Sequence, residues 1–551
     1  MSNALISKTG QQDLGEHPVA SVKTNRKTSV INPPRMLAVG LWVFYVSCGL
    51  YLTFHLHYFA GDALSRVANA YDVLFGRNPH LGALGFIWNP LPSLFELPVV
   101  ALYKIFPAVV TKGVAGIFVS GLFAAWGAIH LKRILKNFAV PQGWTYVITL
   151  IFALNPLIIL YGANGMSDIM LVSCLLGTYS GVFDFLTTQS LRRLVAAGIW
   201  MALGLGMRYE AVPFGALVIL GLMAAQWGKT SPDRWKGSAI ILGAPIVFSG
   251  GLWIYFNWAI MKNPLYFLDS NYGNLAQTRT GAYLTPALQQ AYHSVTGTMG
   301  YLGHFTLLYW PISLGFVMAV IYAIGRRRDG RALILIFGAV GAVALEMMFA
   351  YLGHLGSWDR YFISFIPDGV LMVSFAAAKL GARFPKRWKT LWWMAISVIL
   401  LLGNVGTILA LQNPVLGHPD GQILDFALQN RSLKHVSDVF YATEPVIQYL
   451  NAHPHLTVLA DSFTAWPIIV RSPNFNRFII TSDYDFASIL YNPRGRVSAI
   501  LVPQPAGVSA LDAVNRAWPQ MWSGHVTWVT LLKSFPGGSN WKLYKVTANA
   551  P

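Results

Sequence analysis

The sequence is poor in charged residues and in cysteine. Charged side chains make up 11% of its 551 residues, whereas soluble domains carry about 25%. Together with a hydrophobic content of 54%, this deficit excludes a soluble globular protein and predicts a chain that crosses a membrane several times. The two cysteines, Cys48 and Cys174, both lie in apolar runs, so we expect neither a disulfide nor a cysteine metal site.

Acidic residues are scarcer than basic ones, 22 against 40, which gives a formal net charge of +18. An excess of this size can indicate a nucleic-acid partner, but the lysines and arginines form short runs between apolar segments. That arrangement is the positive-inside pattern of cytoplasmic loops. We therefore predict contact with membrane lipids and no nucleic-acid partner.

The apolar runs predict a helical, multi-pass protein of the cell membrane with about eleven transmembrane helices. The expected spans are 36–54, 113–131, 144–161, 169–186, 194–207, 211–227, 239–258, 302–324, 332–352, 361–380 and 391–411. No small-residue cleavage site follows the first run, so it should be retained as a span. The proline-rich run 91–107 is predicted to lie at the outer interface, because a crossing there would move the next basic cluster out of the cytoplasm.

The sequence divides into three parts. Residues 1–35 are predicted to be a disordered cytoplasmic tail, and residues 36–411 a membrane domain whose first outer loop, 55–112, contains interfacial helices. From residue 412 the composition becomes that of a soluble α/β domain, which by parity is extracytoplasmic. We find no Gly-rich nucleotide loop, Walker sequence or metal-ligand spacing in this domain.

The first outer loop gathers ionisable and aromatic residues beside an apolar span, which favours a binding function. Asp62 is the leading candidate, because it follows Gly61 and precedes the amphipathic segment ALSRVANAYDVLF. The alternative is that Asp62 only caps this helix. Other candidates for substrate contact in the loop are Arg66, His57, His80, Trp88 and Asn89.

Three later outer junctions add charged residues on the same predicted face. Asp168 ends one junction, Arg208 and Glu210 form the second, and Arg360 with Tyr361 opens the third. A carboxylate can take a proton from an acceptor hydroxyl, and an arginine can bind a phosphate through two hydrogen bonds. The simpler alternatives are a helix cap for Asp168, a local ion pair for the second junction and an interfacial anchor for Arg360.

Four motifs in this order resemble the GT-C superfamily of polytopic glycosyltransferases. They are GDALSR, WNPLPSLFELP, NPLIILYGANGMSD and WDRYFISFIPD, and together they cover residues 36 to about 412. The layout is similar to the branch that contains protein O-mannosyltransferases and the aminoarabinose transferases of lipid A. The resemblance implies a membrane glycosyltransferase fold, with a soluble domain after the last span.

The resemblance further implies transfer of a sugar from a polyprenyl-phosphate donor to a protein, lipid or glycan hydroxyl, with inversion. In this scheme Asp62 is the general base and Asp168 a second catalytic carboxylate. Arg360, Arg208 and Arg66 would bind the donor phosphate, while Glu210 and Tyr361 join the loop residues in contacting substrate.

A divalent cation, Mg or Mn, is left open as a cofactor, with Asp62 and Asp168 as its expected ligands. Many members of the superfamily have two adjacent acidic residues in the first loop, whereas Ala63 follows Asp62 here. Two other functions remain open from the sequence, a transporter or flippase of lipid-linked glycans and a membrane scaffold without catalysis. A transporter would favour polar residues at mid-membrane depth, but here they cluster on one predicted face.

The predicted topology can be tested with single cysteines and an impermeant thiol reagent. Cysteines at Arg192, Lys229 and Lys386 should stay unlabelled in intact cells, whereas a cysteine at Gly507 should be labelled. Labelling of all four after permeabilisation is the control for accessibility. Labelling at Lys229 in intact cells would contradict the predicted orientation.

Overall fold

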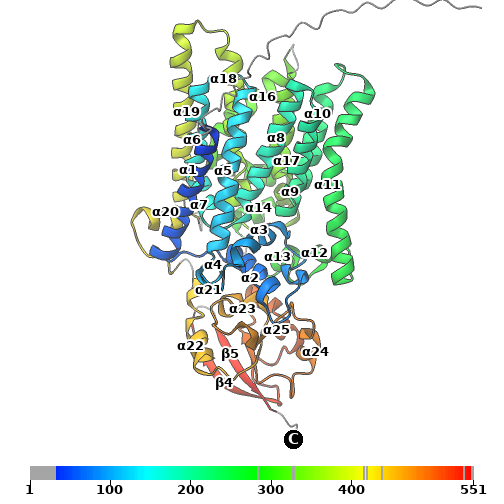
Figure 1. Ribbon diagram of the computed structural model, residues 1–551, viewed down its shortest axis with the longest axis vertical. Helices are drawn as coiled ribbons and strands as arrows, with labels where there is room; N and C mark the ends of the chain where they lie inside the picture. Colours follow the sequence, from blue (N-terminus) through cyan, green and yellow to red (C-terminus); the bar gives the residue numbers. More distant parts are fainter. Residues whose placement is uncertain are drawn as a thin grey trace, which may run out of the picture.

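The computed structural model describes residues 33–547, apart from 282–284, 326–328, 414–415, 417–419, 436–437 and 538–539. It consists of a bundle of long helices with a small α/β domain at one end (Figure 1). We call this end of the bundle the capped end and the opposite end the free end. Most of the predicted tail, 1–32, and the basic run 326–328 lie outside the described residues.

The multi-pass helical class predicted from the sequence is confirmed. Seven described helices are long and apolar enough to cross a membrane, or nine if each of two bent pairs is one span. The predicted spans 194–207 and 211–227 correspond to α9 (Leu191–Met207, 17 residues) and α10 (Ala211–Gln226, 16 residues). Both fall short of the roughly 20 residues that usually cross the hydrocarbon core.

The helices of the bundle run along most of its length (Figure 1). The spans are α1 (Pro33–Leu50) with the π-helical turn η1 (Tyr51–His55), α5 (Val114–Asn137), α6 (Gln142–Ala153) with α7 (Pro156–Ala163), α8 (Ser167–Thr188), α11 (Pro232–Met261), α15 (Val295–Phe305) and η3 (Thr306–Tyr309) with α16 (Pro311–Ile324), α17 (Gly330–Leu352), η4 (Asp359–Phe362) with α18 (Phe365–Gly381), and α19 (Lys386–Gln412). Shorter connecting helices are α2 (Gly61–Phe75), η2 (Leu81–Leu84), α3 (Leu91–Val100), α4 (Ala108–Thr111), α12 (Tyr266–Asp269), α13 (Asn274–Arg279) and α14 (Pro286–Ala291).

Two helices form the centre of the bundle. Inside the protein, 94% of the α8 span and 89% of the span formed by η4 and α18 are buried, against 17% for α11. Gly177 and Gly181 on α8 permit its close contact with α9, because a methyl group at Gly181 would lie 2.7 Å from Cβ of Ala197. Small residues at this spacing let helix backbones approach each other in membranes.

The bend of 65° between α6 and α7 has a local cause in the sequence. Pro156 begins α7, and the side chain of Asn155 caps it by accepting a hydrogen bond of 3.0 Å from the backbone N–H of Leu157. The same amide donates to Asn404 and Thr407 on α19. The break therefore keeps its polar groups satisfied, as a membrane interior requires.

A mixed five-stranded sheet forms the centre of the C-terminal domain, with strand order β2-β1-β3-β5-β4. The strands are β1 (Val458–Leu459), β2 (Phe478–Ile479), β3 (Ala499–Pro503), β4 (Val529–Phe535) and β5 (Trp541–Val546). β1 pairs in parallel with β2 and β3, and β5 is antiparallel to β3 and β4. The helices are α20 (Asp420–Leu428), α21 (Asp438–Tyr441), α22 (Glu444–Ala452), α23 (Ser462–Ile469), α24 (Phe486–Tyr491) and α25 (Ala513–Ala517).

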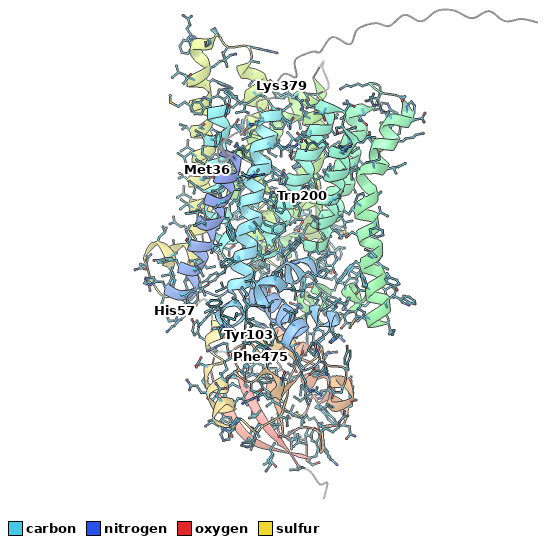
Figure 2. All side chains as sticks on the ribbon, in the orientation of Figure 1. Met36, His57, Tyr103, Trp200, Lys379 and Phe475 are labelled. Carbon is cyan, nitrogen blue, oxygen red and sulfur yellow. The ribbon has the colours of Figure 1, made fainter. Side chains whose placement is uncertain are left out.

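The domain docks on the capped end through aromatic and charged contacts. The ring of Phe475 lies 3.9 Å from that of Tyr71 and 6.3 Å from that of Tyr103, and Figure 2 shows Tyr103 and Phe475 at the junction of the two parts. Arg77 forms ion pairs of 3.2 Å with Asp483 and 2.5 Å with Asp485. Lys379 lies at the free end in Figure 2.

The Arg77 ion pairs predict a variant with a loosened C-terminal domain. In Arg77→Ala the buried carboxylate of Asp483 loses its cation, which should weaken docking by about 1–3 kcal/mol. We expect faster proteolysis between the bundle and the domain and a lower unfolding temperature. Arg496→Ala is the matched control, because Arg496 is exposed and bonds only Ser488 among the described residues. Equal proteolysis of both variants would rule out a role for Arg77 in docking.

Candidate active site

The candidate site lies at the capped end, where the first turns of α2 and α8 meet η4. Asp62 lies in the first turn of α2, but the N-cap position is Ala60 in extended conformation. The side chain of Asp62 is therefore not the cap that the simpler reading proposed. Its negative charge still matches the positive end of the helix dipole.

Asp62 forms an ion pair with Arg360 of η4, with 2.9 Å between Oδ2 and Nη2. The Asp62 side chain is 59% exposed, whereas that of Arg360 is only 14% exposed. Enclosure at this junction raises the pKa of Asp62, but the positive charges of Arg360 and Arg66 outweigh it and lower the pKa below its usual value. Asp62 is thus a carboxylate at neutral pH, accessible from one side.

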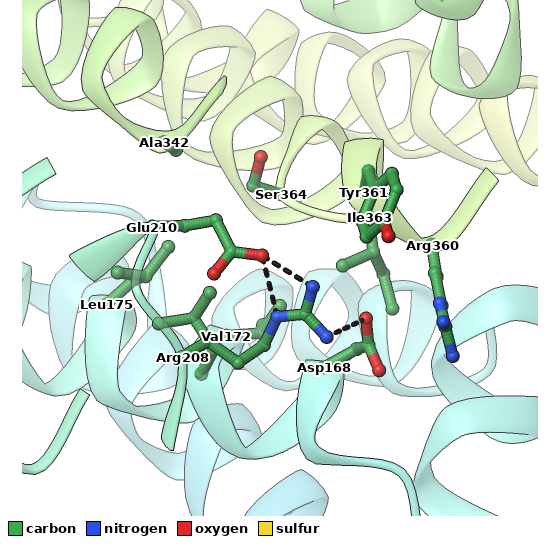
Figure 3. A pocket seen from close by; sticks show the side chains of 11 residues that line it. Asp168, Val172, Leu175, Arg208, Glu210, Ala342, Arg360, Tyr361, Ile363 and Ser364 are labelled. Carbon is green, nitrogen blue, oxygen red and sulfur yellow. Dashed lines mark hydrogen bonds and ion pairs between the residues drawn. The ribbon is translucent and has the colours of Figure 1, made fainter. Parts of the chain in front are cut away.

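A second ion-pair network lies deeper in the protein. Asp168, in the first turn of α8, is 1% exposed, and its Oδ1 lies 2.9 Å from Nη1 of Arg208. Arg208 follows α9 in extended conformation, and its Nε donates a hydrogen bond of 2.7 Å to Oε1 of Glu210. Figure 3 shows Arg208 held between these two carboxylates. The predicted local pair of Arg208 and Glu210 is present, and it extends to Asp168.

Tyr361 connects the two ion pairs. Its ring centroid lies 5.6 Å from the guanidinium carbon of Arg208 and 5.7 Å from that of Arg360. These residues line a small cavity with Asp168, Glu210 and Ser364, whose other walls are apolar side chains of α8, Ala342 of α17 and Ile363 (Figure 3). The cavity therefore combines two guanidinium groups with a buried apolar wall.

Arg66 and Glu96 bring further charge to the site without direct partners. The charges of Asp62, Glu96 and Asp168 all act on Arg66, yet its buried Nη1 has no hydrogen-bond partner in the described part of the chain. Both carboxyl oxygens of Glu96 are likewise buried and unbonded, and burial raises the pKa of this group. Buried polar atoms without partners are uncommon and mark places where a ligand or water binds.

The other predicted substrate residues lie away from this cluster. His57 has a positive φ of 60° and its ring lies 6.4 Å from that of Tyr441. His80 packs on Tyr484 of the C-terminal domain at 4.5 Å. Trp88 is exposed, and Asn89 is buried, where its amide donates a hydrogen bond of 2.6 Å to the carbonyl of Leu205. The structure does not bring these four to the cavity.

The residues present do not fit the divalent cation that the sequence left open. Asp62 and Asp168, its expected ligands, are each paired with a different arginine. Within the described ranges no group of three or more His, Cys, Asp or Glu side chains has the geometry to hold a metal ion. Each of the two carboxylates already has a guanidinium group as its positive partner, in the place that a metal cation would have to take.

Two site residues were not singled out from the sequence. Tyr161, at the end of α7, donates a hydrogen bond of 2.5 Å to Oδ2 of Asp420, the first residue of α20. Tyr161 stands in the motif NPLIILYGANGMSD, whereas Asp420 follows the last span in a Gly/Pro-rich stretch. The sequence feature that could have pointed to Asp420 is its position as a carboxylate just beyond the final span.

Comparison with known proteins supports the predicted resemblance. Residues 98–253, which include Asp168, Arg208 and Glu210, match the family model described as dolichyl-phosphate-mannose-protein mannosyltransferase. No curated protein sequence matches the chain. The resemblance to GT-C glycosyltransferases predicted from four motifs is therefore confirmed by a region that contains one of them in full.

Solved structures show the same fold. The crystal structure of ArnT from Cupriavidus metallidurans bound to undecaprenyl phosphate matches with a TM-score of 0.53 and 14% identity, covering 93% of this chain and 99% of that one. The apo structure of the same protein has a TM-score of 0.50 at the same identity and coverage. An oligosaccharyltransferase from Archaeoglobus fulgidus is more distant, with a TM-score of 0.43 and 10% identity over 85% of this chain and 69% of that one.

Proposed function

We propose that this chain, a multi-pass membrane glycosyltransferase with the GT-C fold, transfers a sugar from a polyprenyl-phosphate donor to an acceptor hydroxyl at the capped end. The observation that carries the proposal is an accessible carboxylate, Asp62, in contact with the guanidinium of Arg360 beside a cavity lined by Arg208. This combination places a base next to a site for phosphate. The likeness to a protein solved with undecaprenyl phosphate supports the donor class.

The donor phosphate would bind to the arginines. Nε of Arg360 and Nη1 of Arg66 are buried without hydrogen-bond partners among the described residues, so both have donors to offer. Among the described residues, the Nη1 atom of Arg360 donates only to the sulfur of Met166, at 3.8 Å. A phosphate satisfies such donors with charge-assisted hydrogen bonds, and the prenyl chain would extend along the apolar helices.

Asp62 would act as the general base. Its carboxylate takes the proton of the acceptor hydroxyl as the hydroxyl oxygen bonds to the anomeric carbon of the donor. The bond from that carbon to the phosphate oxygen breaks, and its electron pair leaves with the polyprenyl phosphate. Attack from the side opposite the phosphate inverts the anomeric configuration, and the arginines stabilise the charge on the leaving group.

The ion pair between Asp62 and Arg360 implies an order of events. While Arg360 holds Oδ2 of Asp62 at 2.9 Å, the carboxylate is a weaker base. A phosphate that takes over Arg360 leaves Asp62 free to accept a proton. Donor binding would thus activate the base, which limits proton abstraction in the absence of donor.

The transporter alternative has no specific support. Residues 98–253 match a mannosyltransferase family model, and Asp62 and Asp168 lie in the first turns of α2 and α8, at the capped end. A transporter would place its binding groups near the membrane midplane.

Removal of the proposed base should abolish most transfer. Asp62→Asn keeps the size of the side chain but not its basicity, so the rate should fall by about two to four orders of magnitude. Transfer is measured from a panel of undecaprenyl-phosphate sugars to membranes of a strain without the gene, by mass spectrometry. Asp72→Asn is the matched control on the same helix. Burial beside Asp483 raises the pKa of Asp72, so replacing this carboxyl with a neutral amide should change the charge of the helix less. Wild-type turnover by Asp62→Asn would reject this mechanism.

The phosphate site is tested separately with undecaprenyl phosphate alone. Arg360→Lys keeps the charge but loses the two-donor geometry, and should weaken binding roughly tenfold, the size of one charge-assisted hydrogen bond. Arg360→Ala should weaken it further. Arg383→Lys, at an exposed arginine outside the site, should bind like the wild type. Unchanged affinity in Arg360→Ala would reduce Arg360 to a structural residue.

A further inference from the structure

A carboxylate from the connection to the C-terminal domain reaches into the site. Asp420 begins α20, just after the last span α19, and is 6% exposed. Its Oδ2 accepts the hydrogen bond of 2.5 Å from the hydroxyl of Tyr161, which is 3% exposed. The two side chains are 259 residues apart in sequence, so this bond joins the start of the C-terminal region to the bundle.

The fold of the connection depends on a glycine. Gly421 lies against the end of α19, where a Cβ atom would fall 1.8 Å from the carbonyl oxygen of Leu411. Any other residue would push α20 away from α19, so Gly421 permits the close return of the chain. This return sets Asp420 opposite Tyr161.

The pair of Asp420 and Tyr161 lies within reach of the charges in the active site. The positive charge of Arg360 and the negative charge of Asp168 act on both Tyr161 and Asp420. Among the described residues, the charge of Asp420 also acts on the hydroxyl of Tyr58 and the carboxyl of Asp359. Arg360 therefore has Asp62 in direct contact and Asp168 acting on it by charge, while Asp420 is held nearby by Tyr161.

We propose that Asp420 is a positioning residue of the phosphate site, which acts on Arg360 through its charge and through its hydrogen bond with Tyr161. This inference rests on the proposed role of Arg360. An ionised Asp420 repels an incoming phosphate and partly offsets the positive charge of the Arg360 guanidinium. A neutral Asp420 does neither. The hydrogen bond fixes the distance over which this charge acts, and it ties phosphate affinity to the connection that leads to the C-terminal domain.

The proposal predicts how phosphate affinity depends on pH. Burial raises the pKa of Asp420 to about 6, so the group is charged above that pH and neutral below it. Affinity for a phosphate should therefore increase as the pH falls through this value. A single charge acting over several ångströms in protein should change the affinity roughly threefold to tenfold.

The experiment measures binding of undecaprenyl phosphate to the purified full-length protein between about pH 5 and about pH 8. Asp420→Asn keeps an acceptor for the Tyr161 hydroxyl but has no charge, so its affinity at the alkaline end should exceed that of the wild type by the factor above. The titration of the lipid phosphate itself is common to all variants and cancels in the comparison. Tyr161→Phe removes a hydrogen bond that lowers the pKa of Asp420, so the pH at which affinity changes should move upward.

Asp425→Asn is the matched control, because Asp425 belongs to the same helix and its carboxylate bonds Gln412 instead. A pH profile of Asp420→Asn that superimposes on the wild type would overturn the inference. If Arg360→Ala binds normally, the proposed phosphate site fails and this inference with it. If Arg360→Ala weakens binding while Asp420→Asn and Tyr161→Phe match the wild type, only the role of Asp420 is rejected.

Discussion

The pairing of arginines with carboxylates in a largely water-free region is the interaction on which the site depends. Asp168 and Arg208 are enclosed where the most buried helix of the bundle, α8, begins. A buried charge without a partner costs several kcal/mol, so each carboxylate there requires a guanidinium. The same requirement makes the arginines available to a ligand, because a phosphate can replace a carboxylate without leaving a cation unpaired.

The C-terminal domain contributes to the site in two ways. Its docking contacts, such as Arg77 with Asp483 and Asp485, hold the domain on the loops that carry Asp62. Its connection carries Asp420 to Tyr161. The C-terminal region is therefore part of the electrostatic surroundings of the candidate site.

The sequence predicted those features that depend on local composition. Hydropathy located the spans, and the placement of basic runs assigned Asp62, Asp168, Arg208 and Arg360 to one end of the bundle, where the structure also has them. Two of the predicted spans correspond to α9 and α10, which are apolar but shorter than the other span helices.

Pairings between distant segments could not be predicted. Arg360 bonds Asp62 nearly three hundred residues earlier, and periodicity within a segment contains no information on such a contact. His57 and His80 were grouped with the site because they share a loop with Asp62, but their rings face the C-terminal region. Sequence proximity is a poor guide in a loop that bends sharply, as the positive φ of His57 shows.

The sheet of the C-terminal domain has a second consequence. Chain order reverses between β1 and β3, and in open α/β sheets the crevice beyond the carboxyl ends of such strands is the usual place for a ligand. Here Asp461, just after β1, accepts hydrogen bonds of 2.8 Å from the hydroxyl of Tyr272 and 2.6 Å from the N–H of Ala513. Tyr272 belongs to a loop of the membrane domain, so a side chain of that loop contacts the C-terminal domain at the carboxyl end of β1. The position that binds small molecules in other open α/β sheets is used here for a contact with another part of the same chain.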